Sequence, residues 1–565
     1  MNINDKSQTT SRRKDRPLGS SAFSAGWGQA LGLALLVLTA IPSFAGSKFS
    51  SDLPQQTKSG MVTVNVQYRQ MPNNASLKSH GGTVRMKHHH INAVTMTLPA
   101  NKLAELAADP NVAYITPDRP VSLSNTTYEE FATAVESDDA ASQFALDGTG
   151  IGVAVIDSGI ADHPDLYDAY GNSRVVYSQS FVAGDSTTAD TFGHGTHVAG
   201  LVGGSGLNSG NANGYQANYA GMARNVNLIN LRVLDQNGSG TDSQVIAAIE
   251  QAIALQSTYN IRVINMSLGR PVFESYTLDP VDQAVEAAWK AGIVVVVAAG
   301  NNGRYWPTNG FVTIGVPGND PAVLTVGATM TENTISRVDD KIASYSSKGP
   351  TAIDHIVKPD VVAPGNRLVS LRVAGSTLDT KYPQYEVAPS NGTPMYFALS
   401  GTSMATPVVS GAVALLLQNN PALTPDQVKA TLMKTAWKGF GQYSQFSWSH
   451  DSWGNTYNNE ADIFTYGAGY LDIDAALNSA DLANGLALSP TVVRNPLTGV
   501  VTIVNTSTSA FGGSSVVWGA NSVVWGNSVV WGLGSTIDSL SVVWGAMSTA
   551  PSSVAALSSG DDGDN

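Results

Sequence analysis

Short apolar runs and segments with helical periodicity alternate along most of this chain. Between residues 145 and 480, five such runs are rich in Val, Ile and Leu. Continuous apolar runs are typical of parallel strands that are covered on both faces. This alternation predicts an α/β fold built on a doubly wound, mostly parallel sheet. The predicted strands are 152–156, 226–233, 263–266, 293–298 and 323–326.

Two sequence signals mark helix ends in the same region. Asp279 and a following proline supply an N-cap and a first-turn residue, and Gly292 is placed to close that helix. Thr424 and Gln427 have the spacing of a capping box that opens a second helix. In doubly wound folds, functional sites lie at the carboxyl ends of the strands.

A smaller α+β pattern precedes this region, at residues 61–118. The valines from Val62 to Val66 alternate with polar residues and predict a half-buried strand. The polar residues 46–60 predict a spacer, and RMKHHH at 85–90 predicts a solvated turn, although a pH sensor or a metal site stays open there. The other predicted elements are strands at 93–98 and 112–115 and a helix at 99–108.

Composition and charge exclude several classes of protein. The chain has 565 residues, no cysteine and a net charge of −13. The absence of cysteine excludes disulfides, thiolate catalysis and iron–sulfur clusters. The negative charge gives no general attraction to nucleic acid or to an anionic membrane, so we expect no nucleic-acid partner.

The first 45 residues have the pattern of a signal peptide. A basic patch from Arg12 to Arg16 precedes an apolar run at 30–41, and small residues stand at Ser43 and Ala45. The run is short for a membrane-spanning helix, which needs about 20 apolar residues. We therefore expect residues 1–45 to be removed by cleavage near Ala45, which gives a secreted or cell-surface protein.

A tail at 481–565 differs in composition from the rest of the chain. It is rich in Ser, Gly, Ala and Val, and the pentapeptide SVVWG occurs four times. Val-Val-Trp has strong strand propensity, and glycine punctuates it. Small stacked strands, binding of a surface or sugar through tryptophan, and aggregation all stay open as interpretations.

Three local motifs contain the residue types of a nucleophilic mechanism. VAVIDSGI places Asp157 at a strand end, GHGTHVAG places His194 at the start of a helical stretch, and SGTSMATPVV places Ser403 at the start of an apolar helix. A serine hydroxyl becomes a nucleophile when a base such as His194 takes its proton. Asp157 would hold the imidazole in the required tautomer. A helix N-terminus at Ser403 favours developing negative charge.

Asn301 is the candidate fourth component. It follows an apolar run that ends in Ala-Ala-Gly. Its amide would donate to the oxyanion of a tetrahedral intermediate, together with the backbone N–H of Ser403. A loop asparagine is usually a turn residue, so this interpretation depends on the place of Asn301 between the His and Ser motifs.

These motifs, in this order, resemble those of the subtilisin-like serine peptidases, and the resemblance covers about residues 61–480. It implies a catalytic domain at 140–480 that hydrolyses peptide bonds in polypeptide substrates with no cofactor for catalysis. It also implies that residues 61–120, which end in YITPDRPV, form an intramolecular inhibitory pro-region removed by self-cleavage. We expect the protein to be a monomer.

The resemblance also implies a cleft that binds substrate as an added β-strand. Each residue assigned to its walls could also be an ordinary strand end or turn residue, but the functional role is favoured because the catalytic motifs support it. Because these walls carry no carboxylate, we expect a broad or apolar substrate preference. The implied residues are Gly238, Ser239 and Gly240 on one edge, Ser267, Leu268 and Gly269 on the other, and Gly315 at the pocket floor.

Asp165 resembles a calcium ligand of the family, so a structural calcium ion is possible. The family's remaining ligand loop is replaced here by the Gly- and Asn-rich segment 203–219. Asp185 and Asp190 are alternative ligands. We expect His197 to pack against the sheet rather than to take part in catalysis.

Three functions are compared on these observations. The first is a secreted serine endopeptidase that is made as a self-processing zymogen. The second is a surface or binding protein that keeps the fold as a scaffold and attaches through the tryptophan repeats. The third is a processing enzyme of narrow specificity, which would line its cleft with acidic residues. The intact set of Asp157, His194, Ser403 and Asn301 favours the first.

Overall fold

The structure of this chain is a computed structural model. The predicted signal peptide and the SVVWG repeats lie outside the residues that it describes. Within the described part of the chain, no helix has both the length and the apolar character needed to cross a membrane. The described residues are 48–50, 52–53, 60–72, 81–122, 128–129, 135, 143–332, 334, 336–439, 446–450, 456–460, 462–495, 497 and 501–504.

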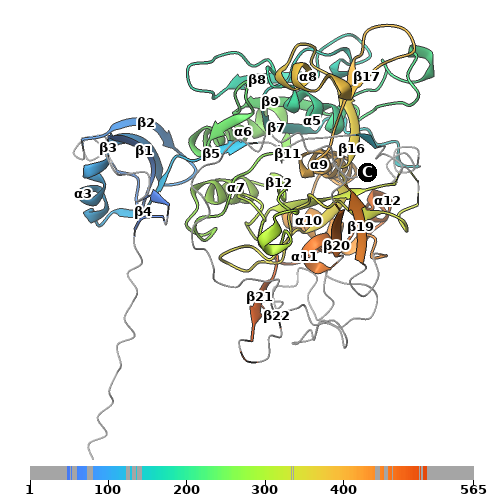
Figure 1. Ribbon diagram of the computed structural model, residues 1–565. Helices are drawn as coiled ribbons and strands as arrows, with labels where there is room; N and C mark the ends of the chain where they lie inside the picture. Colours follow the sequence, from blue (N-terminus) through green and yellow to red (C-terminus); the bar gives the residue numbers. More distant parts are fainter. Residues whose placement is uncertain are drawn as a thin grey trace, which may run out of the picture. The chain divides into compact units, whose positions relative to one another are not determined.

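An antiparallel sheet and one helix form an N-terminal subdomain at residues 48–122, drawn in blue in Figure 1. The strand order is β2-β3-β1-β4. Leu103 and Leu106 of the helix share a buried cluster with Val64 and Val66 of β1, which confirms the predicted strands and helix. The elements are β1 (Met61–Tyr68), β2 (Thr83–His88), β3 (Ala93–Pro99), η1 (Ala100–Lys102), α3 (Leu103–Ala108), β4 (Val112–Pro117) and β5 (Pro120–Ser122).

The N-terminal subdomain begins inside the predicted spacer. Phe49 forms a parallel bridge with Ile115, and Leu53 is buried in the subdomain core. The interpretation of 46–60 as a spacer is therefore wrong for these residues. Two isolated apolar side chains in a polar stretch give no periodicity, so their burial depends on contacts that the local sequence does not reveal.

The predicted turn at 85–90 is also wrong in its first half. Strand β2 continues to His88, which is fully buried, and His88 Nε2 lies 2.8 Å from Thr95 Oγ1. Only His89 and His90 lie in the turn. Alternation along a strand points every second side chain inward, and a polar ring can occupy such a position when it finds a hydrogen-bond partner.

A sheet of eight strands forms the centre of the large domain, which spans residues 128–504 in the described part of the chain. The strand order is β14-β13-β12-β11-β7-β9-β8, and β15 pairs with β13. The pairs are parallel except for β13 with β14, which confirms the predicted α/β fold. The strands are β7 (Gly152–Asp157), β8 (Val175–Ser180), β9 (Asn227–Arg232), β11 (Ile261–Met266), β12 (Val294–Ala298), β13 (Leu324–Met330), β14 (Lys341–Ile342) and β15 (Val361–Pro364).

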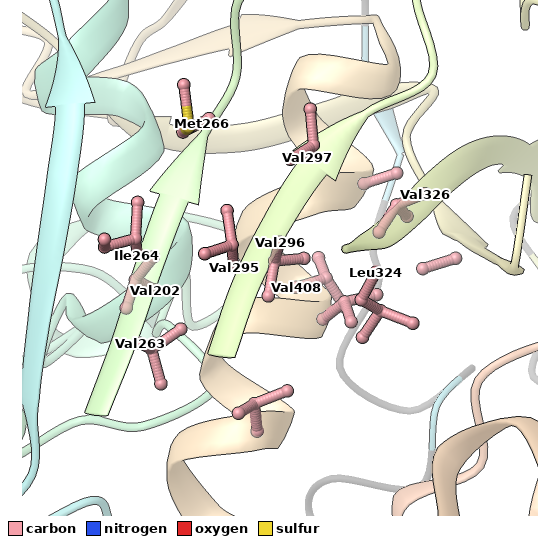
Figure 2. Packing of buried hydrophobic residues seen from close by; sticks show 14 of the residues in the cluster. Val202, Val263, Ile264, Met266, Val295, Val296, Val297, Leu324, Val326 and Val408 are labelled. Carbon is pink, nitrogen blue, oxygen red and sulfur yellow. The ribbon is translucent and has the colours of Figure 1, made fainter. Parts of the chain in front are cut away.

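Helices cover both faces of this sheet. Helices α5 (His194–Gly203) and α9 (Thr402–Asn419) pack against each other and against the central strands, and α6 (Asp242–Tyr259) and α7 (Pro280–Lys290) form a second such pair. Figure 2 shows Val408 of α9 among the valines of β12. The remaining helical elements are α8 (Thr377–Lys381), α10 (Pro425–Thr435), α11 (Ile463–Tyr466), α12 (Ile473–Leu477), η2 (Pro164–Leu166), η3 (Asn211–Asn213), η4 (Trp306–Thr308) and η5 (Pro383–Tyr385).

Side-chain caps begin several of these helices. The carboxylate of Asp279 accepts a hydrogen bond of 2.9 Å from the N–H of Val281, the second residue of α7, and so forms the predicted N-cap. Thr424 and Gln427 form the predicted capping box of α10. Thr241 and its partner three residues later form a further box at the start of α6, which the sequence analysis did not include.

Smaller sheets complete the large domain. Ser489 and Val492, beyond the predicted boundary at 480, pack with it: the hydroxyl of Ser489 lies 2.9 Å from Lys429 Nζ, and Val492 joins the main core. The strands of these sheets are β6 (Tyr128–Glu129), β16 (Arg367–Leu371), β17 (Glu386–Val387) and β18 (Tyr396–Leu399), the hairpins β19 (Phe446–His450) with β20 (Thr456–Glu460) and β21 (Thr491–Arg494) with β22 (Val501–Val504), and β10 (Ser239–Thr241), which pairs with β5.

Stability depends on the valines of the central sheet. Val296 of β12 is fully buried, so Val296→Ala should lower the free energy of unfolding by about 1–3 kcal/mol through lost burial and a residual cavity. Val338→Ala is the matched control, because Val338 is 83% exposed and should change little. The midpoint of guanidinium unfolding measures both variants. Equal midpoints would contradict the packing described here.

Candidate active site

Asp157 and His194 meet where the carboxyl end of β7 reaches the start of α5. His194 Nδ1 lies 2.9 Å from Asp157 Oδ1 and 3.1 Å from Oδ2. The side chains are 1% and 0% exposed. A carboxylate can only accept in this contact, so the ring proton belongs on Nδ1 and Nε2 is left as an acceptor.

Asp190 fixes the beginning of α5. Its Oδ1 accepts hydrogen bonds from Ser158 Oγ at 2.8 Å and from the Gly193 N–H at 2.7 Å. Its Oδ2 accepts from both the N–H and the hydroxyl of Thr196, each at 2.8 Å. Full burial raises the pKa of Asp190, and these donors oppose that rise. Asp190 therefore positions His194 through the helix terminus and not by direct contact.

Ser403 lies in the first turn of α9 and faces one predicted wall of the cleft. Its hydroxyl donates to the carbonyl oxygen of Ser267 at 3.0 Å, and the Ser267 hydroxyl donates to the Ser403 carbonyl at 2.8 Å. Among the described residues, His194 Nε2 has no hydrogen-bond partner. Helices α5 and α9, which carry these two groups, are packed together.

The amide of Asn301 is oriented by the residue before Ser403. Asn301 Oδ1 accepts hydrogen bonds from the backbone N–H and from the hydroxyl of Thr402, both at 2.9 Å. The Thr402 hydroxyl also accepts from the Gly300 N–H at 3.2 Å. With its oxygen held in this way, the amide directs its nitrogen, the donor, away from Thr402.

The predicted cleft edge at residues 238–240 is paired with a strand of the N-terminal subdomain. Strand β10 pairs antiparallel with β5 of the N-terminal subdomain, with Ser239 opposite Ser122 and Gly240 opposite Val121. A side chain at 240 has no room, since its Cβ would lie 2.4 Å from a carbonyl oxygen of the neighbouring segment. Gly238, just before β10, has a φ of +69°.

The opposite edge and the predicted pocket floor approach each other closely. The residue after Gly269, Arg270, exchanges two backbone hydrogen bonds of 3.2 and 2.8 Å with Val316. A Cβ on Gly269 would lie 2.8 Å from the Val316 carbonyl, and one on Gly315 would lie 2.8 Å from the Arg270 carbonyl. Glycine at both positions therefore permits this pairing. Leu268, the residue before Gly269 on the same edge, is buried.

His197 has the structural role that was expected. It is fully buried, and its Nε2 lies 3.1 Å from the Leu368 carbonyl and 3.0 Å from the Phe397 carbonyl. Burial, and next the charge of His194, lower the pKa of His197 to about 3. The ring is neutral in the working range of most proteins and donates to one β-strand carbonyl at a time.

The carboxylate of Asp165 is surrounded by donors. It accepts hydrogen bonds from the N–H and the amide of Asn208 at 3.0 and 2.7 Å, from the Ser205 hydroxyl at 3.2 Å and from the Tyr396 hydroxyl at 2.5 Å. Calcium needs six to eight oxygen acceptors, so this arrangement does not fit the ion. The part of the chain that is described holds no group of three or more His, Cys, Asp or Glu residues suited to a metal. A structural calcium ion at Asp165 is therefore not supported, and one elsewhere in the protein stays a prediction.

Two contributing residues were missed by the sequence analysis. Thr402 orients Asn301, and Ser158 links Asp190 to the N–H of Gly195 at 2.9 Å. Each stands directly beside a predicted residue in the sequence, which is the signal that could have found it. The predicted site residues themselves fall at the carboxyl edge of the sheet, and their catalytic roles stay predictions.

Comparisons with known proteins agree with this architecture. The model of the subtilase family matches residues 148–469. Serine protease AprX of Bacillus subtilis (strain 168) is 42% identical over 292 residues, which are 51% of this chain and 61% of that protein. Subtilisin E of the same strain is 34% identical over 361 residues, which are 64% of this chain and 79% of that protein.

A solved structure shows the same fold. The crystal structure of fervidolysin from Fervidobacterium pennivorans, described as a keratinolytic enzyme related to subtilisin, aligns with a TM-score of 0.56 and 22% identity. The alignment covers 81% of this chain and 67% of that one. Because the family match extends over more than half of the sequence, the chain belongs to the subtilase family, the subtilisin-like serine peptidases.

Proposed function

We propose that this protein is a secreted serine endopeptidase that uses Asp157, His194 and Ser403. The observation that carries the proposal is the buried hydrogen bond between His194 Nδ1 and Asp157, because it leaves Nε2 as a base beside α9. Ser403 lies in the first turn of that helix. The mechanism uses no cofactor.

The proposed reaction passes through an acyl-enzyme. The Ser403 hydroxyl leaves the Ser267 carbonyl and turns toward His194. Its oxygen bonds to the carbonyl carbon of the scissile peptide while its proton moves to Nε2. The C–N bond then breaks as Nε2 protonates the leaving amine. A water molecule repeats the two steps on the ester, and Ser403 regains its proton.

Two donors would stabilise the oxyanion. One is the Asn301 amide nitrogen, whose direction is set because Thr402 holds the amide oxygen. The other is the backbone N–H of Ser403, at a helix N-terminus where the peptide dipoles favour negative charge. Loss of one such donor typically costs about 100- to 1000-fold in turnover.

We propose that the N-terminal subdomain is the inhibitory pro-region. Its strand β5 lies on β10, which is the edge that a substrate would use. Asp118 accepts hydrogen bonds from the Ser243 N–H and hydroxyl at 2.7 and 2.6 Å, so it caps α6. Gln67 donates to the Leu278 carbonyl just before α7. Self-cleavage after β5 would release the subdomain.

Export and substrate class complete the proposal. The basic, apolar and small-residue order of the first 45 residues supports export with cleavage near Ala45. The pairing of β10 with the extended segment β5 supports polypeptide substrates that bind in extended form. We propose that the mature protein acts as a monomer.

The role of Ser403 is tested by comparing the parent chain with Ser403→Ala. The parent should lose the N-terminal subdomain, react with a fluorophosphonate and hydrolyse casein, whereas the variant should keep its full size and do neither. Mass spectrometry and labelling measure these outcomes. A parent that neither matures nor reacts would show that the assignment is wrong.

The orientation of Asn301 is tested by Thr402→Val, which removes the hydroxyl at nearly constant volume. Losing this hydrogen bond should lower kcat about tenfold with little change in KM, because the amide matters most in the transition state. Thr406→Val is the matched control: its hydroxyl, in the same helix, bonds only to the Thr402 carbonyl in the described contacts. If both variants lose equal activity, Thr402 does not orient the amide.

The cap on α6 is tested by Asp118→Asn. The change removes a charge at a helix N-terminus and replaces one of the two acceptor oxygens by a donor, so release of the cleaved subdomain should be about tenfold faster. The measurement is the lag between cleavage, followed by gel, and the onset of peptide hydrolysis. Glu105→Gln is the control, because Glu105 pairs with Lys102 on the surface of α3. An unchanged lag for Asp118→Asn would contradict the role of the cap.

A further inference from the structure

The side chain of Arg119, the residue directly before β5, is buried against the large domain. Its Nη1 and Nη2 donate to the two oxygens of Glu274 at 2.5 and 2.6 Å. This is the bidentate geometry that a guanidinium forms with a carboxylate. The ring of Phe273 lies 4.9 Å from the guanidinium carbon. Arg119 is only 2% exposed.

Most of the groups around Arg119 belong to the large domain. Asp279 Oδ2 lies 3.7 Å and Asp242 Oδ2 lies 4.0 Å from Nη1. The N-terminal subdomain supplies one carboxylate, Asp52, at 2.9 Å from Nε and from Nη2. The large domain thus contains an arginine pocket, which we define as Glu274, Asp242, Asp279 and the ring of Phe273.

The arginine pocket continues both edges of the proposed substrate cleft. Asp242 directly follows β10, and Glu274 lies five residues beyond Gly269 on the opposite edge. Arg119 directly precedes the segment that pairs with β10, and its carbonyl accepts a hydrogen bond of 2.8 Å from the Asp242 N–H. Any chain that added to β10 in the same register would place a side chain at this pocket.

We infer that the mature enzyme keeps the arginine pocket as a subsite for an arginine of the substrate, one residue before the segment that pairs with β10. This inference rests on the proposed function, because the subdomain must leave for a substrate to enter. The inference adds a preference for a positively charged substrate residue. The cleft walls assigned from the sequence carry no carboxylate and gave no reason to expect it.

The charge balance of the pocket supports a guanidinium as its ligand. When Arg119 leaves, Arg270 is the remaining cation in contact, and it already pairs with Asp242 at 2.7 Å and with Asp279 at 2.7 Å. Glu274 then loses its bidentate partner. Burial and the charge of Asp279 raise the pKa of Glu274, while Arg119 lowers it. A substrate arginine would restore the missing positive charge, and lysine lacks the planar fork that matches Glu274.

The test is an arginine scan in internally quenched peptides. One arginine is moved through the positions before the cleaved bond of a peptide that otherwise carries glutamine there. The enzyme is matured, and its active sites are counted by fluorophosphonate labelling. One position should raise kcat/KM about 10- to 100-fold over glutamine, with lysine weaker and the neutral isostere citrulline equal to glutamine.

Variants connect that preference to the pocket. Glu274→Gln should reduce the ratio of the arginine to the glutamine peptide at least about tenfold. Glu286→Gln is the matched control: Glu286 pairs with Lys290 on α7 outside the pocket, so the ratio should persist. If Glu274→Gln does not mature, the inference is tested on the parent enzyme alone, by whether kcat/KM falls from the arginine peptide to the lysine peptide to the citrulline peptide.

The outcomes separate this inference from the proposed function. An enzyme that labels and cleaves the glutamine peptide but prefers arginine at no position overturns the subsite and leaves the peptidase intact. A preference that survives in Glu274→Gln also overturns it. Failure of labelling and of all hydrolysis would instead overturn the proposed function.

Discussion

Burial of both faces of the central sheet is the constraint on which the rest of this structure depends. With α5 and α9 on one side and α6 and α7 on the other, strands such as β12 must be apolar throughout, and Val294 to Val297 fill that requirement. In β7 the residues before the last are apolar or glycine, and the polar side chain stands at the carboxyl end. Asp157 is the first polar side chain after the buried run of β7, so the same constraint places it at the carboxyl edge.

Two helix termini carry the proposed catalytic groups that do not lie at a strand end. His194 opens α5 and Ser403 lies in the first turn of α9, so two of the three proposed catalytic groups sit where backbone N–H groups have no helical partner. These termini are held by polar contacts, from the buried Asp190 for α5 and from the half-buried Asn301 for the start of α9. An unpaired acceptor or donor at such depth costs about 1–3 kcal/mol, which makes the arrangement rigid as well as specific.

The sequence predicts those features that depend on neighbours along the chain. The valine runs, the cap at Asp279 and the box at Thr424 are local, and the structure confirms them. The partial burial of Phe49 depends on Ile115, which is far away in the sequence, and the burial of His88 depends on Thr95 in the paired strand β3. The contact between Arg119 and Glu274 spans 155 residues, so no local pattern could reveal it. In the sequence, Phe49 is an isolated apolar residue, and His88 and Arg119 are polar residues in polar surroundings, so none of them stands out.

The N-terminal subdomain shows how an extended peptide can bind in the cleft, because its strand β5 pairs with β10. Backbone pairing of β5 with β10 is independent of side chains, so it fixes register without selecting a sequence. Selection must then come from pockets beside the paired strand, and the one lined by Glu274 is charged.

Removing one partner from a buried ion pair leaves a charge that is poorly solvated, which is far less favourable than the pair itself. Departure of Arg119 therefore leaves Glu274 to take up a proton, admit water or accept another cation. The arginine pocket binds Arg119 while the subdomain is in place, and it is free to bind a substrate arginine after the subdomain leaves. Inhibition and substrate choice therefore depend on the same pocket.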